Sequence, residues 1–182
     1  MSRSFAVAFA GVPGSSKTII SNYLSTKFNL PVFNNDQLRF EVKEDMRAAN
    51  INIPEVLDEY ERRYTERFED FLSTGHSMLL DGSIDRRWGQ TKKQLKKFGY
   101  AWFVIDMEFS PKFLEEFFIA TGRPKFLDQL SKYLDDHAKF MKKYVGDVGV
   151  QITDDQFYDR LKIAESALRK FINDLENGGI KS

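Results

Sequence analysis

Gly11-Val-Pro-Gly-Ser-Ser-Lys-Thr18 is the stretch that decides the fold, and it follows directly on an apolar run, Phe5 to Ala10. A buried strand, a glycine-rich turn and then Lys-Thr opening a helix is the order that a phosphate-binding loop requires. Backbone N–H groups of such a turn cradle phosphate oxygens, aided by the positive end of the helix dipole. We therefore expect a nucleoside triphosphate to bind at Gly11, Val12, Pro13, Gly14, Ser15, Ser16, Lys17 and Thr18.

Two side chains of this loop carry the expected chemistry. Lys17 would reach the β- and γ-phosphates, and the Thr18 hydroxyl would ligate Mg²⁺. Ser16 stands where the usual pattern, G-x-x-x-x-G-K-[ST], has its second glycine. A serine there costs roughly 1 kcal/mol if the position needs a positive φ. The alternative is an ordinary strand-to-helix loop, but the order of strand, loop, Lys-Thr and apolar helix favours the phosphate-binding interpretation.

The composition of the whole chain excludes several classes of protein. Its 182 residues, 1–182, are expected to form a single domain. Because 27 basic residues balance 27 acidic ones, net charge gives no attraction to nucleic acid or membranes. The sequence has no cysteine, which excludes disulfides, thiolate metal sites and cysteine nucleophiles. The apolar run before the loop is too short for a signal peptide, and no stretch reaches membrane-spanning length. We expect a soluble cytoplasmic protein.

Helical and strand patterns alternate along the chain, which is typical of an α/β sheet with crossover helices. Right-handed crossovers place helices on both faces, so we expect a three-layer domain around a mostly parallel sheet of five strands. The expected strands are 5–10, 30–34, 77–80, 100–106 and 148–152. The expected helices follow the loop, begin near Asp36 and Pro54, and then span 88–98, 111–119, 124–144 and 157–175. Ligands of such sheets bind beyond the carboxyl ends of the strands.

Asp36 follows the second expected strand. A carboxylate there could accept the proton of an acceptor hydroxyl as that hydroxyl attacks the γ-phosphate. Arg39, three residues on, would share its helix face and could hold an anionic group of the acceptor. Equally, Asp36 could be a helix cap and Arg39 a solvated neighbour, so the positions alone leave both interpretations open.

Two further acids lie at the ends of expected strands, and the chain has two histidines. Asp81 ends the apolar strand at 77–80, where an acid holds Mg²⁺ in nucleotide-binding proteins, and we favour that role. Asp106 also ends a strand, but we interpret it as a structural turn residue. His76 and His137 are far apart in sequence, without ligand partners at metal-binding spacing, and are interpreted as structural or exposed. No metal other than Mg²⁺ is predicted.

Three segments carry a resemblance to a known family of kinases. They are the loop, Asn35-Asp-Gln-Leu-Arg39, and Leu79-Leu-Asp-Gly-Ser83 with Arg86-Arg87 just beyond it. The chain resembles the P-loop kinases related to polynucleotide kinase, zeta-toxin kinases and chloramphenicol phosphotransferase, which are similar to nucleoside monophosphate kinases. The resemblance spans roughly residues 5–123. It implies the P-loop NTPase fold with strand order 2-3-1-4-5, Asp36 as catalytic base, acceptor contacts from Arg39 and Arg86, and acceptor-covering helices at 36–74.

The family usually carries arginines in a mobile lid after the fourth strand. The corresponding segment here, 121–147, has Arg123 together with several lysines, and phenylalanines precede it where an arginine is expected. Lys17 and Arg123 are therefore the candidate cations for catalysis. Because an arginine finger contributes a factor of 10³ or more, an arginine-poor lid bears directly on the rate of transfer.

Two functions follow from these observations. The favoured one is an ATP- and Mg²⁺-dependent phosphotransferase acting on a hydroxyl or phosphate of a small molecule, nucleotide or nucleic-acid end. The alternative is a nucleotide-binding regulator with weak or no transfer activity. Ser16 in place of the second glycine and the arginine-poor lid both favour this alternative. A GTPase ranks last because no Asn-Lys-x-Asp or Asp-x-x-Gly element is present. A lysine stripe at 92–97 makes a nucleic-acid partner conceivable but not favoured, and we expect a monomer or homodimer without membrane contact.

Overall fold

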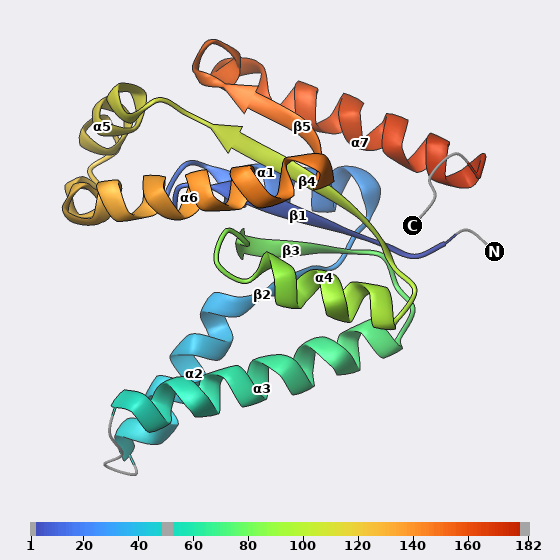
Figure 1. The fold of residues 1–182 in the computed structure, drawn as a ribbon, viewed down its shortest axis with the longest axis horizontal. Coiled ribbons are helices and arrows are strands. Elements are labelled where there is room, and N and C mark those ends of the chain that lie inside the picture. The colour runs from blue at the N-terminus through green and yellow to red at the C-terminus, as the bar shows by residue number, and fades with distance from the viewer. Residues whose placement is uncertain (1–2, 49–52, 179–182) are drawn as a thin grey trace.

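A five-stranded parallel sheet forms the centre of the molecule (Figure 1). The computed structural model describes residues 3–48 and 53–178. The strands are β1 (Phe5–Gly11), β2 (Val32–Asn34), β3 (Met78–Ser83), β4 (Ala101–Glu108) and β5 (Val148–Thr153). Their spatial order is β2-β3-β1-β4-β5. The predicted α/β fold, the five strands and the order 2-3-1-4-5 are confirmed.

The central strand β1 is buried along its whole length, as its unbroken apolar run predicts. Alternate side chains point to opposite faces of the sheet, so the two faces receive different residues. Phe5, Val7 and Phe9 enter one hydrophobic core, and the small Ala6 and Ala8 enter the other. The helices therefore pack around a strand with a bulky face and a flat face.

Helices cover both faces of the sheet (Figure 1). The first core lies under α1 (Lys17–Phe28), α5 (Pro111–Ala120) and α7 (Arg160–Glu176). The second lies under α3 (Ile53–Ser73), α4 (Trp88–Lys97) and α6 (Leu130–Tyr144). Helix α2 (Asn35–Ala48) packs against α3, and in Figure 1 the two form an arm that extends beyond the sheet.

Some predicted boundaries differ from the observed ones. The helix expected from Pro124 begins as a 3₁₀ turn, η1 (Pro124–Gln129), before α6, and η2 (Val145–Asp147) follows α6. The capping box at Thr153 and Gln156 is present, but it opens a 3₁₀ turn, η3 (Asp154–Asp159), that precedes α7. Among the described residues, no helix combines the length and apolar character needed to cross a membrane.

Two acids expected at strand ends lie inside strands. Asp81 sits within β3, and Asp106 sits within β4, paired in register with Ala10 and Gln151. The interpretation of Asp106 as a turn residue is therefore wrong. The apolar run breaks at these positions, but hydrogen bonding to neighbouring strands continues past them, so hydropathy alone places the strand ends too early.

Candidate active site

The loop between β1 and α1 has three residues in left-handed backbone conformations. These are Gly11 at φ 111°, Gly14 at φ 85° and Ser16 at φ 80°. A Cβ on Gly11 would lie 2.8 Å from the carbonyl oxygen of Met107, so glycine is required there by space as well as conformation. Ser16 does occupy the conformation that favours glycine, and it carries the predicted strain of roughly 1 kcal/mol.

The Lys17 side chain is folded back into this loop. Its Nζ donates hydrogen bonds to the carbonyl oxygens of Gly11 at 2.7 Å and Val12 at 2.6 Å, and to the Ser15 hydroxyl at 3.3 Å. Burial lowers the pKa of Lys17 to about 8, opposed by the negative charges of Asp85, Asp106 and Asp81. At neutral pH the ammonium is still mostly protonated, so a buried positive charge lies at the mouth of the loop.

Thr18 and Asp81 lie together beside this lysine. The Thr18 hydroxyl donates to Oδ1 of Asp81 at 3.2 Å, although the two residues are 63 positions apart. A hydroxyl and a carboxylate are hard oxygen donors of the kind that Mg²⁺ prefers. The two residues predicted as metal ligands are thus brought together, and their chemistry fits that ion.

Asp85, which the sequence interpretation missed, holds the start of the loop. Its carboxylate accepts a hydrogen bond from the Gly11 backbone N–H at 3.1 Å and another from the Ser83 hydroxyl. Ser83 also contacts the carbonyl oxygen of Gly11, at 3.2 Å. The segment that follows β3 therefore fixes the end of β1 and the entry into the loop.

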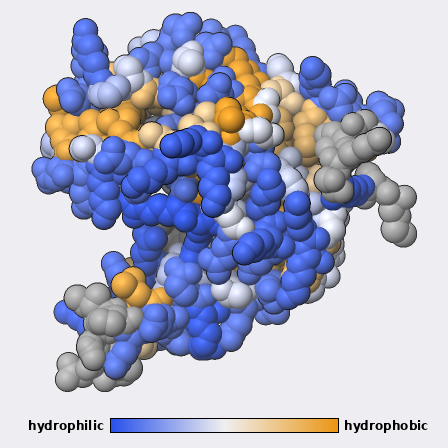
Figure 2. All heavy atoms as spheres, in the orientation of Figure 1, coloured by the Kyte–Doolittle hydropathy of each residue, from blue (hydrophilic) through white to orange (hydrophobic). Residues whose placement is uncertain are grey.

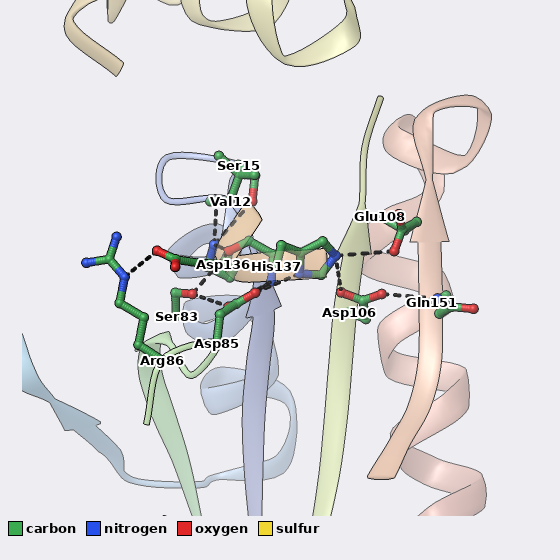
Figure 3. Close-up of polar contacts among 12 residues, drawn as sticks. Val12, Ser15, Ser83, Asp85, Arg86, Asp106, Glu108, Asp136, His137 and Gln151 are labelled. Atoms are coloured by element: carbon green, nitrogen blue, oxygen red, sulfur yellow. Dashed lines mark hydrogen bonds and ion pairs between the residues drawn. The ribbon is translucent and has the colours of Figure 1, made fainter. Parts of the chain in front are cut away.

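His137 of α6 reaches across to the same carboxylate. Its Nδ1 lies 2.6 Å from Oδ1 of Asp85, and its Nε2 lies 3.2 Å from Glu108 and 3.4 Å from Asp106 (Figure 3). Burial lowers the pKa of His137, but the hydrogen bond to Asp85 and the surrounding carboxylates outweigh burial and raise it to about 9. The sequence spacing around His137 indicates no ligand partners because its acidic partners come from other elements; of the two interpretations offered, structural or exposed, the side chain is buried.

Asp106 is fully buried beneath this histidine. Its Oδ2 accepts a hydrogen bond from Gln151 at 3.2 Å, while its Oδ1 has no hydrogen-bond donor among residues 3–48 and 53–178. Burial raises the pKa of Asp106 to about 6, against the opposing effects of His137 and Gln151. Asp85, Asp106, Glu108 and His137 form one polar cluster behind the phosphate loop, which we call the histidine cluster.

Two arginines contact the loop from outside. Arg123 donates to the carbonyl oxygen of Gly14 at 3.3 Å, so it lies beside the loop. Arg160, which the sequence interpretation missed, donates to the Ser16 hydroxyl at 3.2 Å and lies 4.0 Å from the ring centre of Phe157. Its place just after the capping box is the signal that could have found it, since that box positions η3 beyond the end of β5.

The residues predicted to bind the acceptor are less closely grouped. Asp36 is the second residue of α2, and its side chain lies outside the described residues. Arg39 is exposed and lies 5.5 Å from the ring centre of Tyr60. Arg86 pairs with Asp136 of α6 at 2.6 Å. Within the described part of the chain, neither arginine makes a hydrogen bond or ion pair with the phosphate loop.

The α2–α3 arm carries a separate, exposed set of ion pairs. Arg62 pairs with Glu59 and Glu66, and Arg63 pairs with Glu59 and Asp45. The arginines of this arm therefore pair with acids of the same two helices. Charges of this kind are screened by solvent and hold the helices together only weakly.

No protein-family model matches the chain, and no curated protein sequence matches it. Solved structures do resemble it. A gluconokinase from Sinorhizobium meliloti 1021 superposes with a TM-score of 0.69 at 14% identity, over 99% of this chain and 100% of that one. The APS kinase CysC from Mycobacterium tuberculosis, in complex with AMPPNP and APS, gives 0.56 at 16% identity over 93% and 99%. A sugar kinase from Janibacter sp. HTCC2649 gives 0.53 at 18% identity over 90% and 98%. At these identities the likeness establishes the P-loop kinase fold.

Proposed function

We propose that this chain is an ATP- and Mg²⁺-dependent phosphotransferase that moves the γ-phosphate of ATP to a hydroxyl or phosphate group of an acceptor. The acceptor class is a small molecule, a nucleotide or a nucleic-acid end, as in the polynucleotide kinase, zeta-toxin and chloramphenicol phosphotransferase group that the motifs resemble. One observation carries the proposal: the buried Lys17 ammonium lies within the loop, next to the Thr18–Asp81 pair.

The loop supplies the phosphate contacts in this proposal. The Lys17 ammonium now donates to the carbonyl oxygens of Gly11 and Val12, and it would exchange them for phosphate oxygens of ATP. Such charge-assisted hydrogen bonds in a buried site are stronger than neutral ones. Thr18 and Asp81 would hold Mg²⁺, which supplies neutralisation of charge on the β- and γ-phosphates.

The acceptor side of the proposal rests on position. Asp36 opens α2 beyond the carboxyl end of β2, where it would accept the proton of the attacking hydroxyl. Arg39 and Arg86 are the candidates for holding an anionic acceptor. Figure 2 shows a hollow with mainly hydrophilic walls between the α2–α3 arm and the rest of the molecule, which suits a polar acceptor.

The lid of the proposed enzyme is the segment 121–147. Arg123 and Phe126 at its start lie against Gly14, and Arg160 at the start of α7 donates a hydrogen bond to the Ser16 hydroxyl. Arg123 and Arg160 are thus available to neutralise charge that spreads over the transferring phosphoryl oxygens. The arginine expected from the family pattern would be replaced by this pair.

The alternative, a nucleotide-binding regulator with weak or no transfer activity, is favoured by one feature. Ser16 holds a left-handed backbone conformation in the loop. This conformation is strained for serine but not for glycine, so a loop with Ser16 costs more free energy to form than one with glycine. Tight nucleotide binding without acceptor-dependent turnover would be the property of that alternative.

An acceptor screen distinguishes the two functions. ATP turnover is measured with nucleosides, nucleotides, sugars, aminoglycan precursors and 5′-hydroxyl oligonucleotides, using the wild-type chain and Asp36→Asn. We expect one acceptor class to stimulate turnover, and Asp36→Asn to lower the stimulated rate by about 10²–10⁴-fold with ATP binding retained. Glu44→Gln, an exposed acid on the same helix, is the matched control and should behave as wild type.

Each outcome of the acceptor screen supports one of the two functions. ATP binding without stimulation by any acceptor would favour the regulator. Acceptor-dependent turnover that survives Asp36→Asn unchanged would keep the phosphotransferase but remove Asp36 as its base.

A further inference from the structure

The histidine cluster opens onto a cavity that the proposed phosphotransfer does not use. This cavity has a volume of about 910 Å³ and lies between the ends of β4 and β5, α5 and α6. Its lining includes Glu108 and His137. The cluster is therefore reachable from solvent on the side of Glu108, while its other side is formed by Asp106, which is fully buried in β4.

Three side chains of the cluster present ligand atoms to one point. One ligand atom from each of Asp106, Glu108 and His137 lies within 4.8 Å of the other two. From Nε2 the distances are 3.4 Å to Asp106 and 3.2 Å to Glu108. Ligands about 2.1 Å from a metal, at angles of about 90–109°, lie about 3.0–3.4 Å apart. Both distances from Nε2 match that spacing without rearrangement of the histidine.

Asp106 provides a second, independent indication. The residue is completely buried, and its Oδ1, which lies 3.4 Å from Nε2 of His137, accepts no hydrogen bond from any residue that the structure describes. A buried carboxylate oxygen without a donor is costly, and native proteins rarely leave one. Gln151 satisfies the other oxygen and fixes the carboxylate plane, so the unsatisfied oxygen stays directed at the cluster (Figure 3).

Asp85 orients the histidine in the way that metal sites require. A ligating imidazole commonly donates its other N–H to a carboxylate, which fixes the ring and leaves the second nitrogen for the metal. Nδ1 of His137 lies 2.6 Å from Oδ1 of Asp85, and Asp85 is itself held by the Gly11 N–H. Nε2 is thereby turned toward Asp106 and Glu108.

The geometry points to a second metal site: we propose that Asp106, Glu108 and His137 bind a divalent transition-metal ion of the Zn²⁺ or Co²⁺ type. Imidazole favours these ions over Mg²⁺ and Ca²⁺, which take oxygen ligands. Water from the cavity completes the coordination. Binding replaces the proton on Nε2 of His137, and that proton leaves to solvent. This site is distinct from the Thr18–Asp81 pair and does not depend on the proposed phosphotransfer.

Cobalt titration of the chelator-treated chain, without nucleotide, tests the proposal. Visible absorption follows Co²⁺ binding, and calorimetry in buffers of different ionisation enthalpy follows the released proton. We expect one equivalent of Co²⁺ to bind, Zn²⁺ to displace it, and a tenfold excess of Mg²⁺ to leave it in place. A proton should be released on binding near neutral pH.

Two ligand variants and two controls locate the ion. Glu108→Gln and His137→Gln should each weaken Co²⁺ binding at least about 10-fold, since outer-shell changes alone cost 10–100-fold. Glu108 is half exposed, so its variant keeps the result interpretable if His137→Gln fails to fold. Asp135→Asn, an exposed acid lining the same cavity, and Asp81→Asn should bind as wild type.

The proposal is overturned if the wild-type chain takes up no Co²⁺ or Zn²⁺. It is equally overturned if Glu108→Gln leaves affinity unchanged, or if Asp81→Asn abolishes it, because the ion would then lie at the phosphate loop. Complete displacement by Mg²⁺ would exclude a site built around imidazole.

Discussion

The histidine cluster and the α2–α3 arm use the same kinds of charged side chain in opposite surroundings. In the cluster, the His137 and Asp85 side chains are 8% and 6% exposed. In the arm, Arg62 and Glu66 are 55% and 60% exposed at a similar contact distance. The contact geometry alone does not reveal which of the two regions matters more for stability.

The two regions differ in how far burial removes their charged side chains from water. Charges in a protein interior interact strongly because water does not screen them, but each depends on its partner to offset lost hydration. Exposed pairs contribute little because solvent competes for both partners. We therefore expect changes in the cluster to cost far more than equivalent changes in the arm, and the following predictions test that difference.

Removing Asp85 should have the largest effect on stability. Asp85→Ala leaves the buried His137 and the Gly11 N–H without their partner, and breaking a buried pair costs about 3–5 kcal/mol. Urea denaturation of the metal-free protein measures the loss, with Asp135→Asn as the matched control. A loss no larger than that of the control would break the comparison between the two regions.

The pH dependence of the metal-free protein sharpens the same point. The pKa of His137 is raised from 6.5 to about 9, so its stabilising contribution is complete below pH 6.5 and is lost as the pH rises through about 9. Asp106, with a pKa of about 6, has ionised below this range. Lys17, with a lowered pKa of about 8, acts in the opposite direction only above that value.

Unfolding free energy should therefore fall between pH 6.5 and 8 in the wild type, and His137→Gln should flatten this slope. Chemical denaturation at several pH values with a chelator present provides the measurement. An equal slope in both proteins would mean that the cluster does not hold a protonated histidine.

Ser16→Gly should have a smaller effect, of opposite sign. Glycine relieves the left-handed strain at φ 80°, and we expect a gain of about 1 kcal/mol in unfolding free energy, reduced by the lost contact with Arg160. Thermal and chemical denaturation give the value. Destabilisation instead would show that the Arg160 contact outweighs the strain.

Glu59→Gln in the arm should have the smallest effect. Hydrogen bonds from Arg62 and Arg63 lower the pKa of Glu59 to about 2, so any stabilisation is present above pH 4.5 and is lost as the pH falls through 2. Glu59 is partly exposed, at 22%, and its partner Arg62 is 55% exposed, so solvent screens the pair and we expect at most a small change in the unfolding midpoint at pH 7 and physiological salt. A midpoint shift comparable to that of Asp85→Ala would contradict the contrast between the regions.

The sequence predicted the parts of this molecule that are contiguous in the chain. The loop, the strand pattern and the capping box each lie within a few residues, so local spacing reveals them. The proximity of Thr18 and Asp81 was also predictable, because Thr18 follows the glycine-rich loop after one strand and Asp81 follows the apolar run of another.

The histidine cluster could not be predicted in the same way. Its members come from the segment after β3, from the interior and the last residue of β4, and from the middle of α6, and only packing brings them together. Asp106 lacks any local signal that distinguishes a buried strand acid from a turn residue. Arg160 likewise lies 144 positions from its partner Ser16.

The central claim is that the loop and the Lys17 ammonium bind the phosphates of a nucleotide, and calorimetric titration with Mg²⁺–ATP tests it directly. We expect binding to the wild type and to Lys27→Met, an exposed control on the same helix. Lys17→Met should weaken it at least about 30-fold, because loss of a buried charged contact costs about 2–5 kcal/mol. Absence of measurable binding to the wild type, or equal affinity in Lys17→Met, would contradict the account.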